Sequence, residues 1–547
     1  MKLKTLLLGA AAAFAFAPAA FAERGTDGEV KLTFPQAVSI MNPYLSAGTK
    51  DIIAASMVVE PLAAIDDQGV LATRLAAEIP TLENGGISAD LTSITWKLLP
   101  GLMWSDGTPM TADDAVFTAA YCMDPEGGCA QLTKYEGVKS VEAVDPTTIK
   151  VTFTGPKPNP YTAFVGALSP ILQRAQFAAC QGAAAPTCTD PNNMPIGTGP
   201  FMVTGFTVND TVSLAANPNY RDAAKPAFAT AVIKGGGDAE GSARAVMETG
   251  EFDYGWNTQI PPDSQAAMAA AGKGTFVVAF GTLVERIEMN MTDPSPDLAE
   301  GERSTAKHPH PILSDIKVRQ ALSMAIDRSI LVEVGYGAGG RPTCNIIPGP
   351  DAWASDNTGC IAQDMPGAMA LLDEAGWVVG ADGIREKDGK KLAILYQTTV
   401  NPIRQDFQAL IKDWWTELGV QVELKAIDPG VFFGGDAGSP DTFQKFYADV
   451  EMYANNSDNP DPETYLGQYQ CKNAPSPDNQ WQGENMNRFC DPAYDAKVAE
   501  LSTTTDIAAR QTIAKELFLV TISFSSLAIA CRAAMSVVVL SSAIFAS

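Results

Sequence analysis

The stretch from Ile403 to Leu424 constrains the fold more than any other region of the chain. Its first half carries apolar residues at helical spacing, all on one face: Ile403, Phe407, Leu410, Ile411, Trp414 and Leu418. Gly419 is placed to end this helix. The apolar residues that follow it alternate as in a half-buried strand: Val420, Val422 and Leu424. A helix followed at once by a strand is the unit of a layered α/β fold.

The same two patterns recur elsewhere in the chain. Two alternating runs predict strands, the first with Ile94, Trp96 and Leu98 and the second with Ile149, Val151 and Phe153. Thr111, with Asp114 three residues later, resembles a capping box and predicts a helix through Tyr121. After Asp315 we expect a helix whose apolar face holds Val318, Ala321, Leu322, Ala325, Ile326 and Ile330. With 46% apolar and 18% charged residues, the chain has ample material for several cores.

The first twenty-two residues predict an export signal. Lys2 and Lys4 precede an apolar run, and Ala20-Phe21-Ala22 ends it with the small residues that a signal peptidase requires. The run is shorter than a typical membrane span. No cysteine begins the mature chain at Glu23, so we expect no lipid anchor and a soluble protein of the periplasm.

Eight of the nine cysteines form neighbouring couples separated by turn-forming residues. The couples are Cys122 with Cys129, Cys180 with Cys188, Cys344 with Cys360 and Cys471 with Cys490. Because an exported chain meets an oxidising compartment, we expect four disulfides that each close one loop. Cys531 has no evident partner. A zinc site is disfavoured, since no couple has two-residue spacing and histidine is nearly absent.

Charge and the inventory of reactive residues exclude several classes of function. Without Lys2 and Lys4, 36 basic residues face 63 acidic ones, a net charge of −27 that repels nucleic acid and anionic lipid. His308 and His310 are the only histidines, in a proline-bound loop that suits neither a catalytic triad nor a metal site. The glycine-rich "KGGGDAEGSAR" lacks the residues of a phosphate loop. We therefore predict no catalysis, no cofactor and no metal.

Five segments resemble the extracellular solute-binding proteins of family five, the peptide-binding components of ABC importers. They are "LATRLAAEIP", "WKLLPGLMWSDGTPMTADDAVFT", "NMPIGTGPFMVTGF", "AVMETGEFDYGW" and "LSDIKVRQALSMAIDRSILV", in the order and spacing of that family. The resemblance covers Lys31 to Leu517. It implies an α/β periplasmic-binding-protein fold of class II, cluster C type. Two lobes joined by a hinge would capture a ligand, and the first lobe would carry an inserted α+β subdomain.

The resemblance also implies domain boundaries and partners. After the signal peptide (1–22) we expect an opening segment of lobe I (23–70), the inserted subdomain (71–194), a second segment of lobe I (195–285), lobe II (286–494) and a lobe I return with an atypical tail (495–547). The partners would be a peptide ligand and the permease subunits of an ABC importer in the inner membrane, with no nucleic acid. We expect a monomer.

The acidic stretch "NNSDNPDPETY" from Asn455 to Tyr465 resembles the family segment whose aspartate contacts the amino terminus of the ligand. Asp458 is the first candidate for that contact and Asp461 the second. Asp461 is equally well placed to cap a helix with Pro462 at its first position. A calcium loop is disfavoured because prolines interrupt the oxygen ligands that such a loop needs.

Three further residues are candidate ligand contacts by their positions in the family. Arg404, near a helix start, would bind the carboxylate of the ligand, although a solvated arginine fits equally well. Tyr44 and Trp256 fall where relatives approach the cleft, and both suit core packing as well. Alternative ligands are an oligosaccharide, an opine-like compound or a nickel chelate. A peptide-holding chaperone and an exported hydrolase are less favoured.

The apolar tail "FLVTISFSSLAIACRAAMSVVVLSSAIFAS" departs from the family pattern. A transmembrane helix is one interpretation, but Arg532 divides the run into two segments that are each shorter than a usual span. We favour a truncated or frame-altered tail. If exposed, a β-prone apolar segment of this kind is an aggregation hazard.

Overall fold

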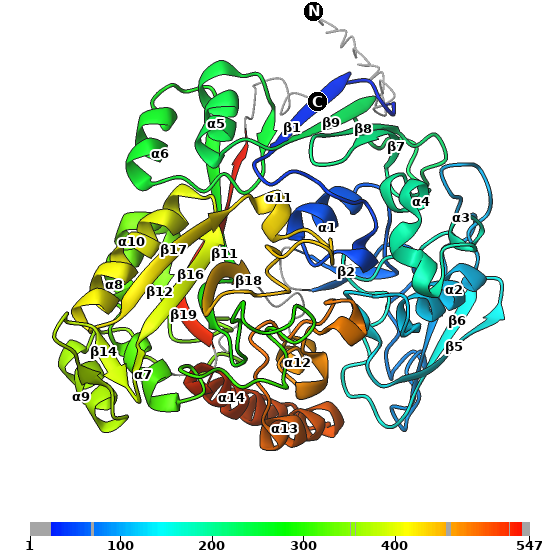
Figure 1. The fold of residues 1–547 in the computed structure, drawn as a ribbon. Helices are drawn as coiled ribbons and strands as arrows, with labels where there is room; N and C mark the ends of the chain where they lie inside the picture. The colour runs from blue at the N-terminus through cyan, green and yellow to red at the C-terminus, as the bar shows by residue number, and fades with distance from the viewer. Residues whose placement is uncertain are drawn as a thin grey trace, which may run out of the picture.

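One large sheet runs through both halves of the molecule (Figure 1). The computed structural model describes residues 23–66, 70–349, 352–355, 357–455, 461–524 and 526–538. Within these ranges the sheet has 11 strands, ten of them in the order β17-β16-β18-β11-β19-β10-β1-β9-β8-β7, while β12 pairs with β19 beside this path. The expected signal peptide lies outside the described residues.

The first lobe is built on the β7 end of this sheet. Its strands are β1 (Glu29–Phe34), β7 (Phe201–Thr207), β8 (Thr211–Ala216), β9 (Thr230–Gly235) and β10 (Tyr254–Gly255). Its helices are α1 (Thr49–Ala55), α5 (Ala239–Arg244) and α6 (Pro262–Ala269). Phe34, Val58, Leu214 and Ile233 are among the buried side chains that form its core.

An α+β subdomain with a core of its own lies beside this lobe, in cyan in Figure 1. It contains β2 (Ala63–Ile65), β3 (Leu71–Thr73), β4 (Ser93–Lys97), β5 (Val138–Asp145), β6 (Thr148–Phe153), α2 (Ala112–Met123), α3 (Arg174–Phe177) and α4 (Thr189–Asn193). The predicted strands correspond to β4 and β6, which pair antiparallel. At the start of α2, the Thr111 N–H donates to Asp114 Oδ2 at 2.9 Å, which confirms the capping box.

The second lobe is built on the other end of the sheet. Its strands are β16 (Ala393–Thr399), β17 (Gln421–Ile427) and β18 (Val450–Asn455), with the short β12 (Gly340–Pro342), β13 (Val378–Val379), β14 (Arg385–Lys387) and β15 (Lys390–Lys391). Its helices are α7 (Ile316–Met324), α8 (Arg328–Gly335), α9 (Met365–Glu374), α10 (Pro402–Glu417), α11 (Pro429–Phe432), α12 (Glu463–Gly467), α13 (Pro492–Thr503) and α14 (Ile507–Phe524). The last two helices fall mostly in the segment expected to return to lobe I (495–547), but they share a buried core with α12. The predicted helix and strand of the Ile403–Leu424 stretch are α10 and β17.

Two antiparallel strands connect the lobes. They are β11 (Thr275–Met289) and β19 (Ser526–Val538). β11 pairs with β18 of the second lobe, whereas β19 pairs with β10 of the first. β19 comes from the apolar tail, so the portion of the tail that the structure describes continues the sheet. Among the described residues, no helix is both long enough and apolar enough to cross a membrane.

Two sequence predictions are settled by the geometry. All four expected disulfides are present, so this prediction is confirmed. The prediction of one continuous helix from Val318 to Ile330 is wrong at its end, because the chain forms two helices there. The Asp327 carboxylate accepts the N–H groups of Ser329 and Ile330 and so begins α8, which leaves Ile330 41% exposed.

Candidate functional site

The sheet of the second lobe has one apolar and one polar face, and the polar face is buried. Strand alternation turns Ile287, Tyr396 and Met452 toward the core under the helices. The opposite face carries Arg286, Glu288, Gln397, Glu451 and Tyr453, each at most 3% exposed. Strand register places three of these side by side, because Glu451 pairs with Gln397 on β16 and with Glu288 on β11. We call these five residues the polar face.

Arg286 is a fully neutralised cation on this face. Its Nε lies 2.7 Å from Glu288 Oε1, and its Nη1 donates to the Tyr465 hydroxyl at 2.7 Å. Its guanidinium carbon lies 5.3, 5.9 and 5.8 Å from the ring centroids of Tyr453, Tyr465 and Tyr469. Burial lowers the pKa of Arg286, but Glu288 and the tyrosines outweigh it and raise that pKa well above its ordinary value. The charge of Arg286 is therefore permanent.

Glu451 is the acid of the polar face that has no cation within ion-pair distance among the described residues, although the charges of Arg488 and Arg286 act on it and oppose the rise in its pKa that burial causes. Its Oε2 accepts from Gln397 Nε2 at 3.0 Å, while its Oε1 is buried with no hydrogen-bond partner among the described residues. Burial raises the pKa of Glu451 well above its ordinary value. The nearby Arg488 directs its donors to main-chain carbonyl oxygens of Ser304, Gln444, Lys445 and Met486. Burial lowers the pKa of Arg488 to about 10.

Aromatic rings beside the polar face meet the first lobe. Phe432, Phe433, Phe443 and Tyr453 contact one another with ring centroids 4.9 to 6.3 Å apart. Ala47 of the first lobe packs against this cluster. Because Tyr453 belongs to both groups, the polar face is turned toward the boundary between the lobes rather than toward the helices behind the sheet.

A buried ion-pair network also crosses between the lobes. Lys157 of the subdomain lies 2.5 Å from Glu463 Oε1 at the start of α12, and Arg510 of α14 lies 2.8 Å from Glu463 Oε2. Arg510 binds Asp461 as well, at 2.6 Å. Burial raises the pKa of Glu463, but Lys157 and Arg510 outweigh it, and the net effect lowers that pKa. Lys157 therefore ties the subdomain to the acidic stretch of the second lobe.

The structure separates the predicted ligand residues into different surroundings. Asp458 lies outside the described residues. Asp461 is ion-paired with Arg510, and burial raises its pKa although Arg510 opposes that shift. Arg404 is buried in the first turn of α10, with its Nε 2.8 Å from Glu285 Oε1. Asp461 and Arg404 are thus paired within the protein, and their contacts with a ligand stay predictions.

The two predicted aromatic residues belong to different cores. Tyr44 is fully buried in the core of the subdomain, and its hydroxyl donates to the Pro170 carbonyl at 2.6 Å. Trp256 is half-buried against Phe34, with ring centroids 5.0 Å apart. Near Trp256, a small cavity opens between the lobes, lined by Gln36, Asp238 and Asn257 on one side and by Thr399, Asn401 and Pro429 on the other. Ligand contact by Tyr44 and Trp256 also stays a prediction.

Sequence reasoning missed the polar face. Its signal was present in "VERIEMN" and "DVEMY", where charged residues alternate with apolar ones inside strand-forming runs. Such alternation normally indicates a solvent-exposed face. Here both faces are covered, so the charges are buried. The described residues contain no group of three or more His, Cys, Asp or Glu side chains placed to hold a metal ion.

Comparison with known proteins finds a matching family model and similar individual proteins. The model of the bacterial extracellular solute-binding proteins, family 5 Middle, matches residues 70–476. Protein XP55 of Streptomyces lividans is 28% identical over 395 residues, which are 70% of this chain but 64% of XP55. A putative ABC transporter peptide-binding protein of Brucella ovis is 24% identical over 442 residues, 78% of this chain and 74% of the relative.

Solved structures share the whole architecture. NikZ from Campylobacter jejuni in complex with Ni(L-His) has a TM-score of 0.78 at 21% identity, over 94% of both chains. The oligopeptide-binding protein AppA from Bacillus subtilis, in complex with a nonapeptide, has a TM-score of 0.78 at 18% identity, over 95% of both chains. At these identities the likeness shows the fold, a two-lobed α/β solute-binding architecture, and leaves the ligand open.

Proposed function

The chain belongs to the bacterial extracellular solute-binding proteins of family 5, and from this membership we propose that it captures peptides in the periplasm for an ABC importer. Members of the family bind a solute without altering it, so the chain is a binding protein and not an enzyme. The proposal extends to its partners. A monomer would close around a peptide and deliver it to permease subunits in the inner membrane.

The observation that carries this proposal is the buried polar face at the boundary of two lobes that β11 and β19 connect. Closure of the lobes around a guest removes water, and charges in such a site then discriminate more strongly than charges at a surface. An extended peptide supplies the matching groups, with N–H and C=O along its main chain and a charge at each end. Asp458 remains our assignment for its ammonium.

A nickel chelate is the second candidate, because NikZ shares the fold as closely as AppA does. The two candidates make different demands on the protein. A chelate presents a metal ion and few donors, whereas a peptide presents a row of main-chain groups. An experiment therefore has to compare the binding of peptides with the binding of a nickel–histidine chelate.

A ligand screen of the mature chain, beginning at Glu23, tests the proposal. The panel contains di-, tri- and pentapeptides, nickel with histidine, and oligosaccharides, and the readout is thermal unfolding confirmed by calorimetric titration. A probe at 100 times its dissociation constant should stabilise the folded chain by about 2.7 kcal/mol. Stabilisation by nickel with histidine or by a sugar, with none by any peptide, would refute peptide capture.

A further inference from the structure

Among the described residues near the lobe boundary, Glu451 is a fully buried acid with no cation within ion-pair distance. Arg286 is paired with Glu288, and Arg404 with Glu285. The cations Lys157 and Arg510 share the carboxylates of Glu463 and Asp461. Glu451 has no ion pair among the described residues, although it is fully buried.

The groups around Glu451 do not fill this gap. On β16, Gln397 donates to one carboxyl oxygen only. On β11, Arg286 is turned to Glu288 and the tyrosines. Arg488, in the segment before α13, opposes through its charge the rise that burial causes in the pKa of Glu451, but it gives its donors to carbonyl oxygens, so Glu451 Oε1 stays without a hydrogen bond among the described residues. Tyr453, two residues along the same strand, faces the aromatic cluster. A buried acceptor without a donor costs free energy, and a ligand donor would remove that cost.

We infer that Glu451 is the anchor for the positively charged side chain of a lysine or arginine in the ligand, while the amino terminus stays assigned to Asp458. This inference rests on the proposed function and names the ligand class more closely. The net charge of the chain, −25 over the full sequence, favours a cation further, because it attracts cations to the protein.

Entry of the cation requires the lobes to separate. Glu451 itself is fully buried, and the boundary beside it is closed by Ala47 against the aromatic cluster and by the Lys157–Glu463 pair. A protonated Glu451 in the empty protein would release its proton as the cation arrives, because an adjacent positive charge favours the carboxylate. Ligand binding and proton release are then coupled.

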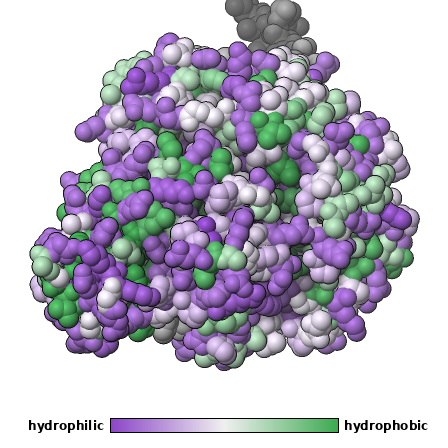
Figure 2. All heavy atoms as spheres, viewed as in Figure 1, coloured by the Kyte–Doolittle hydropathy of each residue, from purple (hydrophilic) through white to green (hydrophobic). Residues whose placement is uncertain are grey.

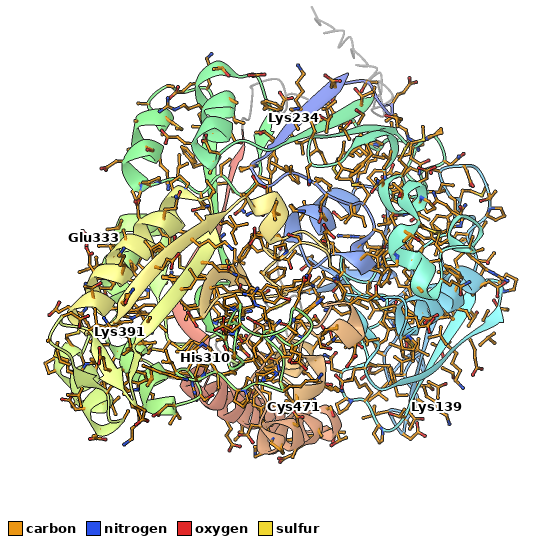
Figure 3. The ribbon with its side chains drawn as sticks, viewed as in Figure 1. Lys139, Lys234, His310, Glu333, Lys391 and Cys471 are labelled. Atoms are coloured by element: carbon orange, nitrogen blue, oxygen red, sulfur yellow. A yellow bond between two sulfur atoms is a disulfide. The ribbon has the colours of Figure 1, made fainter. Side chains whose placement is uncertain are left out.

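The test compares matched peptides on the wild type and on Glu451→Gln. The probes are Ala-Lys-Ala and Ala-Ala-Lys-Ala-Ala, their norleucine analogues, and the N-acetylated form of each. Glutamine keeps the shape and the bond to Gln397 but carries no negative charge. Glu333→Gln is the control, because Glu333 is an exposed acid on α8 of the same lobe (Figure 3) and its loss changes the net charge equally.

In the wild type and in Glu333→Gln, replacing lysine by norleucine should weaken binding about thirtyfold or more. Glu451→Gln should reduce that ratio to near one. Acetylation of the amino terminus should weaken binding alike in all three proteins, because that end of the peptide is assigned to Asp458. Titration in two buffers of different ionisation enthalpy should show proton release in the wild type and none in Glu451→Gln.

Failure of peptide capture and failure of the Glu451 anchor would give different results. If no peptide binds the wild type, peptide capture itself fails, and the anchor falls with it. If peptides bind and Glu451→Gln retains the wild-type ratios, peptide capture stands and the anchor is refuted. Thermal unfolding of Glu451→Gln without a probe checks that it folds. Should it not fold, the wild type decides alone, because equal binding of the charged and uncharged probes excludes the anchor.

Discussion

Removal of the Lys157 ammonium should open the molecule without unfolding either lobe. In Lys157→Met the side chain keeps most of its length, but Glu463 Oε1 loses its partner at 2.5 Å. Breaking a buried pair by removing one partner costs about 3 to 5 kcal/mol. We expect the lower end, because Glu463 keeps Arg510 at 2.8 Å.

The lost interaction destabilises the closed form relative to the open form, because the two partners belong to different lobes. A loss of about 3 kcal/mol lowers the population of the closed form more than about a hundredfold, and the apparent affinity for a captured probe falls by the same factor. The pair needs an ionised Glu463, whose pKa is lowered in the closed form. The contribution of the pair is therefore present at neutral pH and is lost as pH falls through that lowered pKa.

Two measurements check the prediction. Small-angle X-ray scattering of the empty chain should give a larger radius of gyration for Lys157→Met than for the wild type. Calorimetric titration with the tightest probe of the panel should give the loss of affinity. Lys139→Met serves as the control, because Lys139 is an exposed lysine on the same subdomain (Figure 3). Unchanged scattering and affinity would refute the reasoning, as would a large loss of unfolding free energy with unchanged affinity.

Three further predictions concern single groups. Arg404→Met should cost about 3 kcal/mol or more in urea unfolding, because it strands Glu285 in the core, whereas a pure ligand contact would change affinity alone. Replacing Cys344 and Cys360 together by alanine should lower the unfolding free energy by about 3 kcal/mol, given a sequence separation of 16; urea unfolding of the oxidised wild type beside the variant checks this. Burial raises the pKa of Glu451, so the free energy of unfolding of the wild type should fall as pH rises above the ordinary glutamate pKa of about 4.3. Glu451→Gln should lack this loss, which a comparison of unfolding at about pH 5 and about pH 8 checks.

Local signals in the sequence were sufficient for much of the fold. The spacing of Ile403 to Leu418 predicted α10, since one helical face needs only neighbours three and four residues away. The cysteine couples predicted the disulfides for the same reason, because each bond closes a short loop. The family resemblance supplied the two-lobed architecture, which no local pattern contains.

The site was less predictable because its pairings are distant in sequence. Arg404 and Glu285 are 119 residues apart, and nothing near Arg404 indicates that its charge is already neutralised. Glu451 and Gln397 are 54 residues apart and meet only through the register of β16 and β18. The distribution of apolar residues on the surface does not reveal these buried pairs either. Figure 2 shows a largely hydrophilic face on which apolar side chains gather in small patches.

The apolar tail shows how one pattern can fit three structures. A strand covered on both faces, an exposed aggregation-prone strand and a short membrane segment all read as continuous apolar runs. Only the partners of the strand distinguish them, and those partners lie far away in the chain. β19 pairs with β10, β11 and β12, so its backbone groups are used in the sheet and it is not a free edge. Since β19 and β11 join the two lobe sheets, the proposed closure around a ligand would bend these two strands. The two register shifts on β11, between Phe280 and Val284 and between Glu285 and Arg286, are places where such bending would disturb few ladder bonds.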